Sequence, residues 1–153
     1  MMKLDKIDKV ILRNLQQNGR MKNVNLASKV GISAPPCLRR LRFMEQKGII
    51  TGYHASVDME CLGYTVKALC VVSVSSQASE DVDAFIDSIT AVENVVKCLS
   101  TAGSEFFILE IVAKSLSEYE RTLNLYLQSS NIIVEIKSFI IAREHKNKHG
   151  WPI

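Results

Sequence analysis

The 153-residue sequence predicts an α+β protein with an N-terminal winged helix-turn-helix and a following βαββαβ module of the ferredoxin-like kind. Three observations predict this fold. Apolar residues recur at helical spacing in residues 1–50, strand-like runs alternate with helical patterns afterwards, and the net charge changes sign between the two parts. We expect a helical module at 1–50, a wing strand and hinge at 51–64, a second module at 65–145 and a C-terminal tail at 146–153.

The charge of the chain is distributed very unevenly. The formal net charge is +3, but residues 1–50 carry 11 Lys and Arg against 3 Asp and Glu, which gives +8. Residues 51–153 carry the other 8 bases and 13 acids, which gives −5. This asymmetry indicates that the first module binds a polyanion and that the second has another task. A chance distribution of surface charge is the weaker interpretation.

The first helix is predicted in the segment LDKIDKVILRNLQQNG. Its apolar positions at helical spacing include Leu4, Ile7, Ile11 and Leu15. Asp5 and Asp8 would lie in the first turn, where the helix dipole favours negative charge. Gly19 is a plausible end of this helix.

The second helix is predicted in NVNLASKVG. We expect Asn23 to cap its start and Gly31 to end it, because asparagine accepts first-turn amides and glycine tolerates the left-handed conformation. A short turn then leads to a third helix, which completes the helix-turn-helix pattern. The wing would be the next strand-like segment, which contains Ile49, Ile50, Tyr53 and Val57.

The third helix is the most basic segment of the chain. Projected at about 100° per residue, its apolar sector holds Cys37, Leu38, Leu41 and Met44. The opposite face holds Arg39, Arg42, Phe43 and Gln46, with Arg40 and Lys47 on one flank. Arginine and glutamine can pair with guanine and adenine edges in the major groove, and flanking bases can meet phosphates. A solvated helix face would mix signs, whereas this helix has four bases and one acid, so contact with double-stranded DNA is favoured.

Two prolines precede this basic helix. A residue before proline is pushed away from the helical conformation, so we expect the helix to start at Pro36, with Pro35 in the cap position. The amides of Cys37 and Leu38 would then be left for the Ser33 hydroxyl, for water or for a DNA phosphate. This arrangement predicts that the start of the helix points at the DNA backbone.

The second module is predicted from six alternating segments. Strands are expected in TVKALCVVSVSS, NVVKCLST, FFILEIVA and IIVEIKSFII, and helices in SEDVDAFIDSI and SLSEYERTLNLYLQS. The strand FFILEIVA has too few polar residues for one wet face. We therefore expect two helices on one face of the sheet and a second subunit on the other, in an isologous dimer. Such a dimer would present paired helix-turn-helix units to DNA half-sites.

No pattern in the sequence predicts catalysis, a metal site or a cofactor. Nucleophile motifs, a P-loop and a dinucleotide fingerprint are absent, so we expect no enzyme activity. The four cysteines form no CxxC pair, which disfavours zinc. His145 and His149 are four residues apart, but the polar segment EHKNKHGWPI favours a loose tail over a helical metal pair.

The sequence also predicts no membrane association. No apolar run reaches the ~18 residues typical of a membrane span, and the N-terminal segment lacks the apolar core of a signal peptide. We expect a cytoplasmic, nucleoid-associated protein.

Several segments resemble the leucine-responsive regulatory protein/AsnC family, also called feast/famine regulators. They are LDKIDKVILRNLQQNGR, NLASKVGIS and PCLRRLRFMEQKGIITGY, followed by the βαββαβ pattern, and the resemblance covers nearly the whole chain. It implies a transcription regulator whose second domain senses a ligand, often a free amino acid, and forms homodimers that assemble into tetramers or octamers. It also implies that Ser33, Arg39, Arg40 and Arg42 meet DNA. The full predicted DNA surface is Lys22, Asn23, Ser33, Pro35, Arg39, Arg40, Arg42, Gln46 and Lys47.

The resemblance also implies a ligand motif at the turn between the second and third strands. The family typically shows Gly-Asp-Tyr-Asp-Tyr there, whereas this chain has Gly103-Ser104-Glu105-Phe106-Phe107. Both aspartates are missing, so the candidate ligand residues Gly103, Ser104 and Glu105 leave open a different effector, an unusual pose or no effector. An architectural protein that wraps DNA with little sequence preference, without an effector, is the alternative function.

Overall fold

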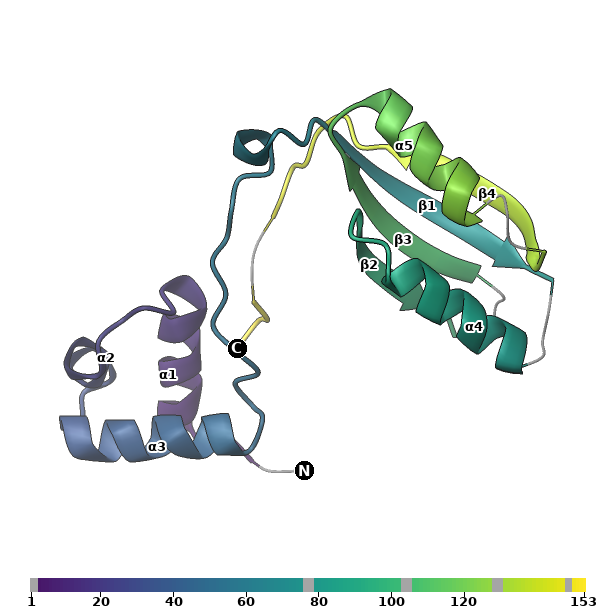
Figure 1. The fold of residues 1–153 in the computed structure, drawn as a ribbon. Coiled ribbons are helices and arrows are strands. Elements are labelled where there is room, and N and C mark those ends of the chain that lie inside the picture. Colours follow the sequence, from purple (N-terminus) through teal and green to yellow (C-terminus); the bar gives the residue numbers. More distant parts are fainter. Residues whose placement is uncertain (1–2, 76–78, 103–105, 128–130, 148–149) are drawn as a thin grey trace. The chain divides into compact units, whose positions relative to one another are not determined.

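The computed structural model describes residues 3–75, 79–102, 106–127, 131–147 and 150–153, which form two compact units (Figure 1). The first unit comprises Met1–Ser56 and Lys146–Ile153, and the second comprises Val57–His145. The C-terminal segment therefore belongs to the helical unit. In the described part of the chain, no helix is both long and apolar enough to cross a lipid bilayer.

Helix α1 spans Lys6–Gln17 and begins with a capping box. The Asp8 amide donates to the Asp5 carboxylate at 2.8 Å, and the Asp5 amide donates to the Asp8 carboxylate at 3.1 Å. Two first-turn amides that have no acceptor within the helix are thereby paired. The helix ends just before the predicted Gly19, with Asn18 in the C-cap position.

Helix α2 spans Asn23–Val30 and ends as predicted at Gly31, which has a φ of 77°. The amides of Gly31 and Ile32 both donate to the Ala27 carbonyl, at 2.9 and 3.1 Å. The prediction that Asn23 caps this helix is wrong, because Lys22 holds the cap position. The Asn23 side-chain amide instead donates to the Ala34 carbonyl at 2.9 Å, and so connects α2 to the start of the next helix.

Helix α3 spans Ala34–Gln46, so the predicted start at Pro36 is wrong. Ser33 holds the cap position, and Pro35 and Pro36 are the second and third residues of the first turn. First-turn amides have no acceptor within a helix, so neither proline removes a helical hydrogen bond. This outweighs the bias against helical conformation before proline. The Cys37 amide, predicted to lack a helical acceptor, donates to the Ser33 carbonyl at 3.3 Å.

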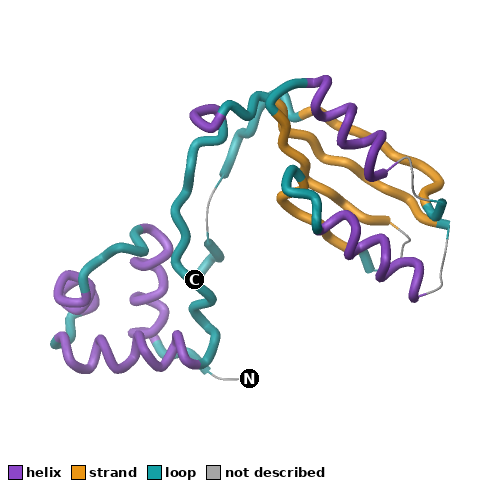
Figure 2. Tube along the Cα trace, viewed as in Figure 1, coloured by secondary structure: helices purple, strands orange, loops and turns teal. Residues whose placement is uncertain are grey.

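The expected wing strand is absent from the described residues 49–58, which belong to neither a helix nor a strand (Figure 2). An extended segment becomes a strand only when another backbone pairs with it, and no such pairing occurs for these residues. The Tyr53 hydroxyl instead donates to Glu45 of α3 at 2.9 Å. The segment is followed by a short 3-10 turn, Glu60–Leu62.

The helical unit has a small apolar core, to which the C-terminal segment contributes. The buried core residues are Ile11, Leu12, Leu26, Ala27, Cys37 and Met44. Ile153 packs against this core, and Arg13 donates two hydrogen bonds to the Ile153 carbonyl, at 2.6 and 3.2 Å. The Trp151 amide donates to the Gln16 side chain. The prediction of a loose tail is therefore wrong for these residues, because both apolar contact and hydrogen bonds hold them on α1.

The described residues of the second unit form a four-stranded antiparallel sheet with the order β2-β3-β1-β4. The strands are β1 Val66–Val74, β2 Val95–Ser100, β3 Phe106–Ala113 and β4 Ile133–Ile140. The helices are α4 Ser79–Thr90 and α5 Leu116–Thr122, which continues as a π-helical turn at Leu123–Leu127. Both helices cover the same face of the sheet (Figures 1 and 2). The predicted βαββαβ order is confirmed.

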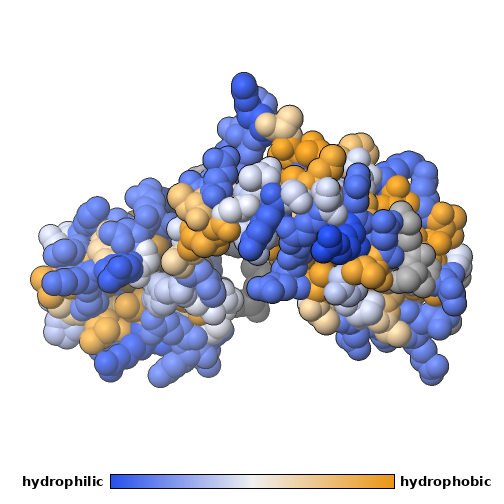
Figure 3. Space-filling model, turned by 45° about the horizontal axis from the view of Figure 1, so that its top comes forward, coloured by the Kyte–Doolittle hydropathy of each residue, from blue (hydrophilic) through white to orange (hydrophobic). Residues whose placement is uncertain are grey.

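The two faces of this sheet differ in burial. On the helix-covered face, alternate residues of β1 and β3 are buried under Phe85, Ile89, Tyr119 and Leu127. The rings of Phe85 and Phe107 meet edge to face with centroids 5.2 Å apart. The other face carries exposed apolar residues, and Figure 3 shows apolar surface on this unit among hydrophilic side chains.

Candidate nucleic-acid interface

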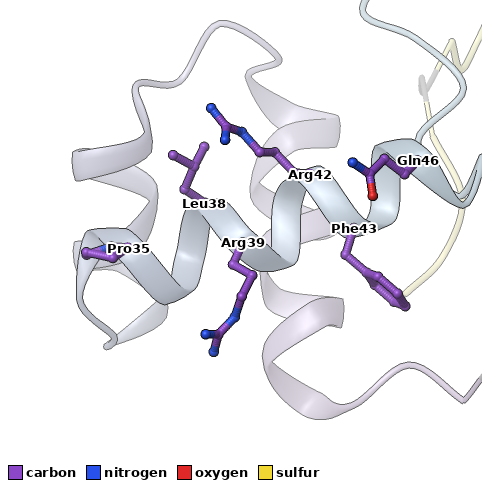
Figure 4. Close-up of a pocket in the computed structure, with 6 residues that line it drawn as sticks. All are labelled: Pro35, Leu38, Arg39, Arg42, Phe43 and Gln46. Atoms are coloured by element: carbon purple, nitrogen blue, oxygen red, sulfur yellow. The ribbon is translucent and has the colours of Figure 1, made fainter.

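The outward face of α3 is a shallow hollow of about 430 Å³ with both cationic and apolar walls. It is lined by Pro35, Leu38, Arg39, Arg42, Phe43 and Gln46. In Figure 4, Arg39 and Phe43 extend to one side of the helix and Leu38 and Arg42 to the other. Each of these pairs is four residues apart, which places its members one turn apart on the helix surface.

The opposite side of α3 fixes the helix in the unit. Cys37 and Met44 are fully buried, as predicted, and burial raises the pKa of the Cys37 thiol, which therefore stays neutral in the core. Leu38 and Leu41, also predicted on the buried side, are half-buried. Leu38 reaches the edge of the outward face and lines the hollow.

Arg39 and Arg42 are exposed and, in the described part of the chain, their side chains form neither an ion pair nor a hydrogen bond with the protein. Their charges are therefore available to an external partner. Gln46, one turn after Arg42, is also exposed. Free guanidinium and carboxamide groups on one helix face are the chemistry that binds guanine and adenine edges.

Arg40 has a different environment from its neighbours. Its guanidinium lies 2.6 Å from the Asp5 carboxylate and 2.8 Å from the Asp8 carboxylate. The Asp8 amide and Arg40 hold the pKa of Asp5 below its usual value, and the two carboxylates raise the pKa of Arg40. Arg40, predicted as a DNA contact, thus connects α3 to the capping box of α1.

Glu45, the only acid of α3, is hydrogen-bonded to Tyr53 in the segment that follows the helix. It accepts the hydrogen bond from Tyr53. Burial of Tyr53 and, to a lesser extent, the nearby Glu45 carboxylate raise the pKa of Tyr53 to about 12. Lys47, at the end of the helix, lies with its ammonium 5.9 Å from the centroid of the Phe43 ring. Glu45 does not line the hollow, whereas Lys47 lies beside Phe43, which does.

Ser33 is exposed at the start of α3, and its hydroxyl makes no capping hydrogen bond. A cap side chain normally accepts from the second or third amide of the helix. Here both positions are prolines, Pro35 and Pro36, which have no amide hydrogen. The hydroxyl therefore lacks its usual intramolecular partner and can face a phosphate.

A second, more polar hollow of about 420 Å³ lies between the end of α1 and α2. It is lined by Asn18, Arg20, Met21, Lys22, Asn25 and Lys29. The sequence predicted only Lys22 of this group, although the density of polar and basic residues from 18 to 29 was a usable signal. Predicted Asn23 lies elsewhere, with its amide bonded to Ala34 and its buried Oδ1 without a hydrogen-bond partner among the described residues.

The predicted ligand residues Gly103, Ser104 and Glu105 lie outside the described residues. The adjacent ends of the hairpin are defined, and Thr101 donates from its amide and its hydroxyl to the Phe106 carbonyl, at 3.2 and 2.9 Å. Within the described ranges, no cluster of three or more His, Cys, Asp and Glu could hold a metal ion.

A basic three-helix unit with an exposed arginine face, joined to a βαββαβ unit, defines a two-domain DNA-binding protein of the helix-turn-helix class. Residues 4–51 match the family model described as "Winged helix-turn-helix DNA-binding", and residues 67–151 match the model described as "Lrp/AsnC ligand binding domain". The chain belongs to the Lrp/AsnC family and is a DNA-binding transcription regulator, not an enzyme.

Curated relatives and solved structures agree with this assignment. The chain is 36% identical over 144 residues to a leucine-responsive regulatory protein of Rhizobium meliloti, with 94% of this chain and 92% of the relative covered. It is 32% identical over 150 residues to the transcriptional regulator AzlB of Bacillus subtilis, with 98% and 96% covered. A transcriptional regulator of Neisseria meningitidis, solved as a complex with L-Met, has a TM-score of 0.92 at 29% identity, covering 98% of this chain and 97% of that one.

Proposed function

We propose that this regulator recognises defined DNA sites through the outward face of α3. The observation that carries the proposal is the contrast between Arg40, which is ion-paired with α1, and Arg39 and Arg42, which have no partner in the described chain. Arg39, Arg42 and Gln46 would contact base edges. Ser33, Pro35 and Lys47 would meet the sugar-phosphate backbone at the two ends of the helix.

The second hollow supports phosphate contacts beside the base-reading helix. Arg20, Lys22 and Lys29 gather at the α1–α2 turn and on α2, where a helix-turn-helix crosses the DNA backbone. These side chains would raise affinity for all sequences and make binding strongly salt-dependent. A protein that used only such contacts would be the architectural, weakly sequence-specific alternative.

The test is a binding assay of the full chain on genomic fragments at about 150 mM salt. We expect strong preference for some fragments, and the Arg42→Ala variant should lose about 1–3 kcal/mol and relax preference at one base position. Arg121→Ala, which removes the same charge from exposed α5, is the matched control and should bind as the wild type does. Equal binding to all fragments, with only a steep salt dependence, would support the architectural alternative.

We propose that the uncovered sheet face joins two copies of the chain in an isologous homodimer, and that these dimers assemble into a tetramer or octamer. Its exposed apolar residues are Leu69, Leu99, Phe106 and Phe139. Its charges pair with one another, as between Lys67 and Glu110 at 2.9 Å, so the loss of hydration is partly compensated when the face is covered. Such a dimer would present two α3 helices to two half-sites.

Leu69→Glu tests this dimer, because Leu69 lies at the centre of the face. The register of β1 places it between Glu110 of β3 and Phe139 of β4. We expect sedimentation at micromolar concentration to change from dimer or larger to monomer, with weaker DNA binding. Leu116→Glu, on exposed α5, is the control and should leave the assembly unchanged. A Leu69→Glu variant that keeps the wild-type mass would contradict the proposed face.

We also propose that a free amino acid or related small metabolite is the effector. The complex of the Neisseria meningitidis regulator with L-Met supports this class of ligand. The sequence Gly103-Ser104-Glu105, which differs from the usual family motif, supports a ligand selectivity that differs from that of typical family members. In a thermal-shift screen of the twenty amino acids, L-Met included, we expect a selective rise in melting temperature. The absence of any shift at millimolar concentration would contradict this proposal.

A regulator acting on the chromosome would be cytoplasmic and nucleoid-associated.

A further inference from the structure

Contacts of arginine and glutamine with base edges do not explain why Phe43 is exposed on the same helix face. Its side chain is 45% exposed on the outward face of α3, where it lines the same hollow as Arg39, Arg42 and Gln46. Cys37 and Met44 fix the helix from the opposite side, so Phe43 is not needed for the core. An exposed phenyl ring leaves apolar area in water, and a partner that covers it is favoured.

The chain itself does not supply that cover. Beside Phe43 lies Lys47, whose ammonium is 5.9 Å from the ring centroid. This contact places a positive charge beside the ring and still leaves the ring substantially exposed. The partner must therefore be negatively charged around the ring, to suit Arg39, Arg42 and Lys47, and apolar where it meets the ring.

DNA offers one apolar group of this kind in the major groove, the C5 methyl of thymine. Gln46 follows Phe43 by three residues and lies on the adjacent turn of the same surface, and a glutamine amide pairs with adenine. The C-terminal half of α3 thus offers partners for both bases of an A·T pair. Arg39 and Arg42, in the preceding turns, offer partners for guanine.

We propose that Phe43 is a specificity-determining residue that packs on a thymine methyl group in each half-site, next to the bases contacted by the arginines. The inference rests on the proposed function, because it requires α3 to lie in the major groove. It adds a preference for T·A pairs at a particular position, which arginine contacts and phosphate contacts do not produce.

The experiment replaces single thymines by deoxyuridine, which removes only the C5 methyl. The duplex is the genomic fragment that the full-length wild type prefers, and affinity is measured by fluorescence anisotropy. Burial of one methyl corresponds to about a fourfold change in affinity, so we expect about a fourfold loss at one thymine position in each half-site. Other thymine positions should change little.

Variants assign the effect to the ring. Phe43→Ala should bind the thymine and deoxyuridine duplexes equally, whereas Phe43→Leu should retain part of the preference. Val24→Ala removes another exposed apolar side chain of the same unit and should keep the full preference. Circular dichroism should show the wild-type helix content for all three variants, because none of these side chains belongs to the buried core.

The outcomes separate this inference from the proposed function. If the wild type prefers its fragment but no deoxyuridine position weakens binding, the thymine contact is wrong and the regulator function stands. If Phe43→Ala keeps the full thymine preference, another side chain recognises the methyl and the assignment of Phe43 is overturned. If the wild type binds all fragments equally, both the proposed function and this inference fail.

Discussion

In the first unit, the outward face of α3 carries arginines without partners, whereas the uncovered sheet face of the second unit carries apolar side chains and charges that pair with one another. Arg39 and Arg42 form no ion pair in the described chain. Lys67 and Lys97, by contrast, both lie close to Glu110, at 2.9 and 3.8 Å. Each face is exposed, but their chemistry differs.

This difference indicates which partner each face suits. Unpaired cations on a rigid helix gain most from a polyanion, which supplies charge and hydrogen-bond acceptors. An apolar face whose charges are already paired is covered by another apolar face at a lower desolvation cost than a face with unpaired charges. We therefore propose that the two units divide DNA binding and self-association between a charged helix and an apolar sheet.

The largest expected effect tests whether the two units are independently stable. Leu109 is fully buried under the helices of the second unit. Leu109→Ala should destabilise that unit by about 2–5 kcal/mol, because a cavity is left in a packed core. Hydrogen exchange should show faster opening of β1 and β3 and unchanged protection of α1 and α3. Leu116→Ala, at an exposed site, is the control, and faster exchange throughout both units would show that they unfold together.

A smaller effect tests the assignment of the C-terminal segment to the first unit. Ile153 is half-buried against the helical core, although it follows β4 in the sequence. Ile153→Ala should destabilise the first unit by about 1 kcal/mol, less than at a fully buried site, and leave the second unchanged. Trp151→Ala, at a side chain that is 84% exposed, should change neither. Loss of protection in the sheet rather than in α1 would contradict the assignment.

A still smaller effect separates Arg40 from Arg39 and Arg42, the two arginines that we propose contact DNA. Arg40→Ala breaks two partly exposed ion pairs with α1, so we expect a loss of no more than about 1 kcal/mol of stability. Base preference should be kept, because the side chains that we propose contact bases remain. Arg42→Ala should show the opposite pattern, with stability kept and base preference changed. Relaxed preference in Arg40→Ala would mean that Arg40 contacts DNA bases directly.

The smallest expected effect is the acid dependence of the two units. Hydrogen bonds lower the pKa of Asp5 in the first unit, and of Glu118 in the second, where Asn94 and the Lys114 amide donate to it. A lowered folded-state pKa contributes stability that is complete above the unfolded pKa, near pH 4 for carboxyl groups, and is lost as pH falls through the folded value. Asp5→Asn should flatten this acid dependence only in the first unit, and Glu118→Gln only in the second. Flattening in both units by either variant would contradict the division.

Local sequence patterns predicted most of the elements correctly, and they failed where a distant residue supplies the partner. Gly31 ends α2 as expected, because a left-handed C-cap depends on glycine itself. Asn23 does not cap α2, because Lys22 holds the cap position, and the Asn23 side-chain amide donates to the Ala34 carbonyl, eleven residues away. The wing strand was predicted from β-branched and aromatic residues, but a strand also requires a pairing backbone that the sequence pattern does not reveal.

The sequence by itself determined the order of helices and strands, the basic first unit and the face of α3 that carries Arg39 and Arg42. These features depend on residue type and on the periods of helix and strand, which are local properties. Only the tertiary structure decided that Arg40 pairs with Asp5 and Asp8, and that Ile153 packs on the helical core. Contacts between residues far apart in the chain depend on how the elements pack, and periodicity carries no information about that packing.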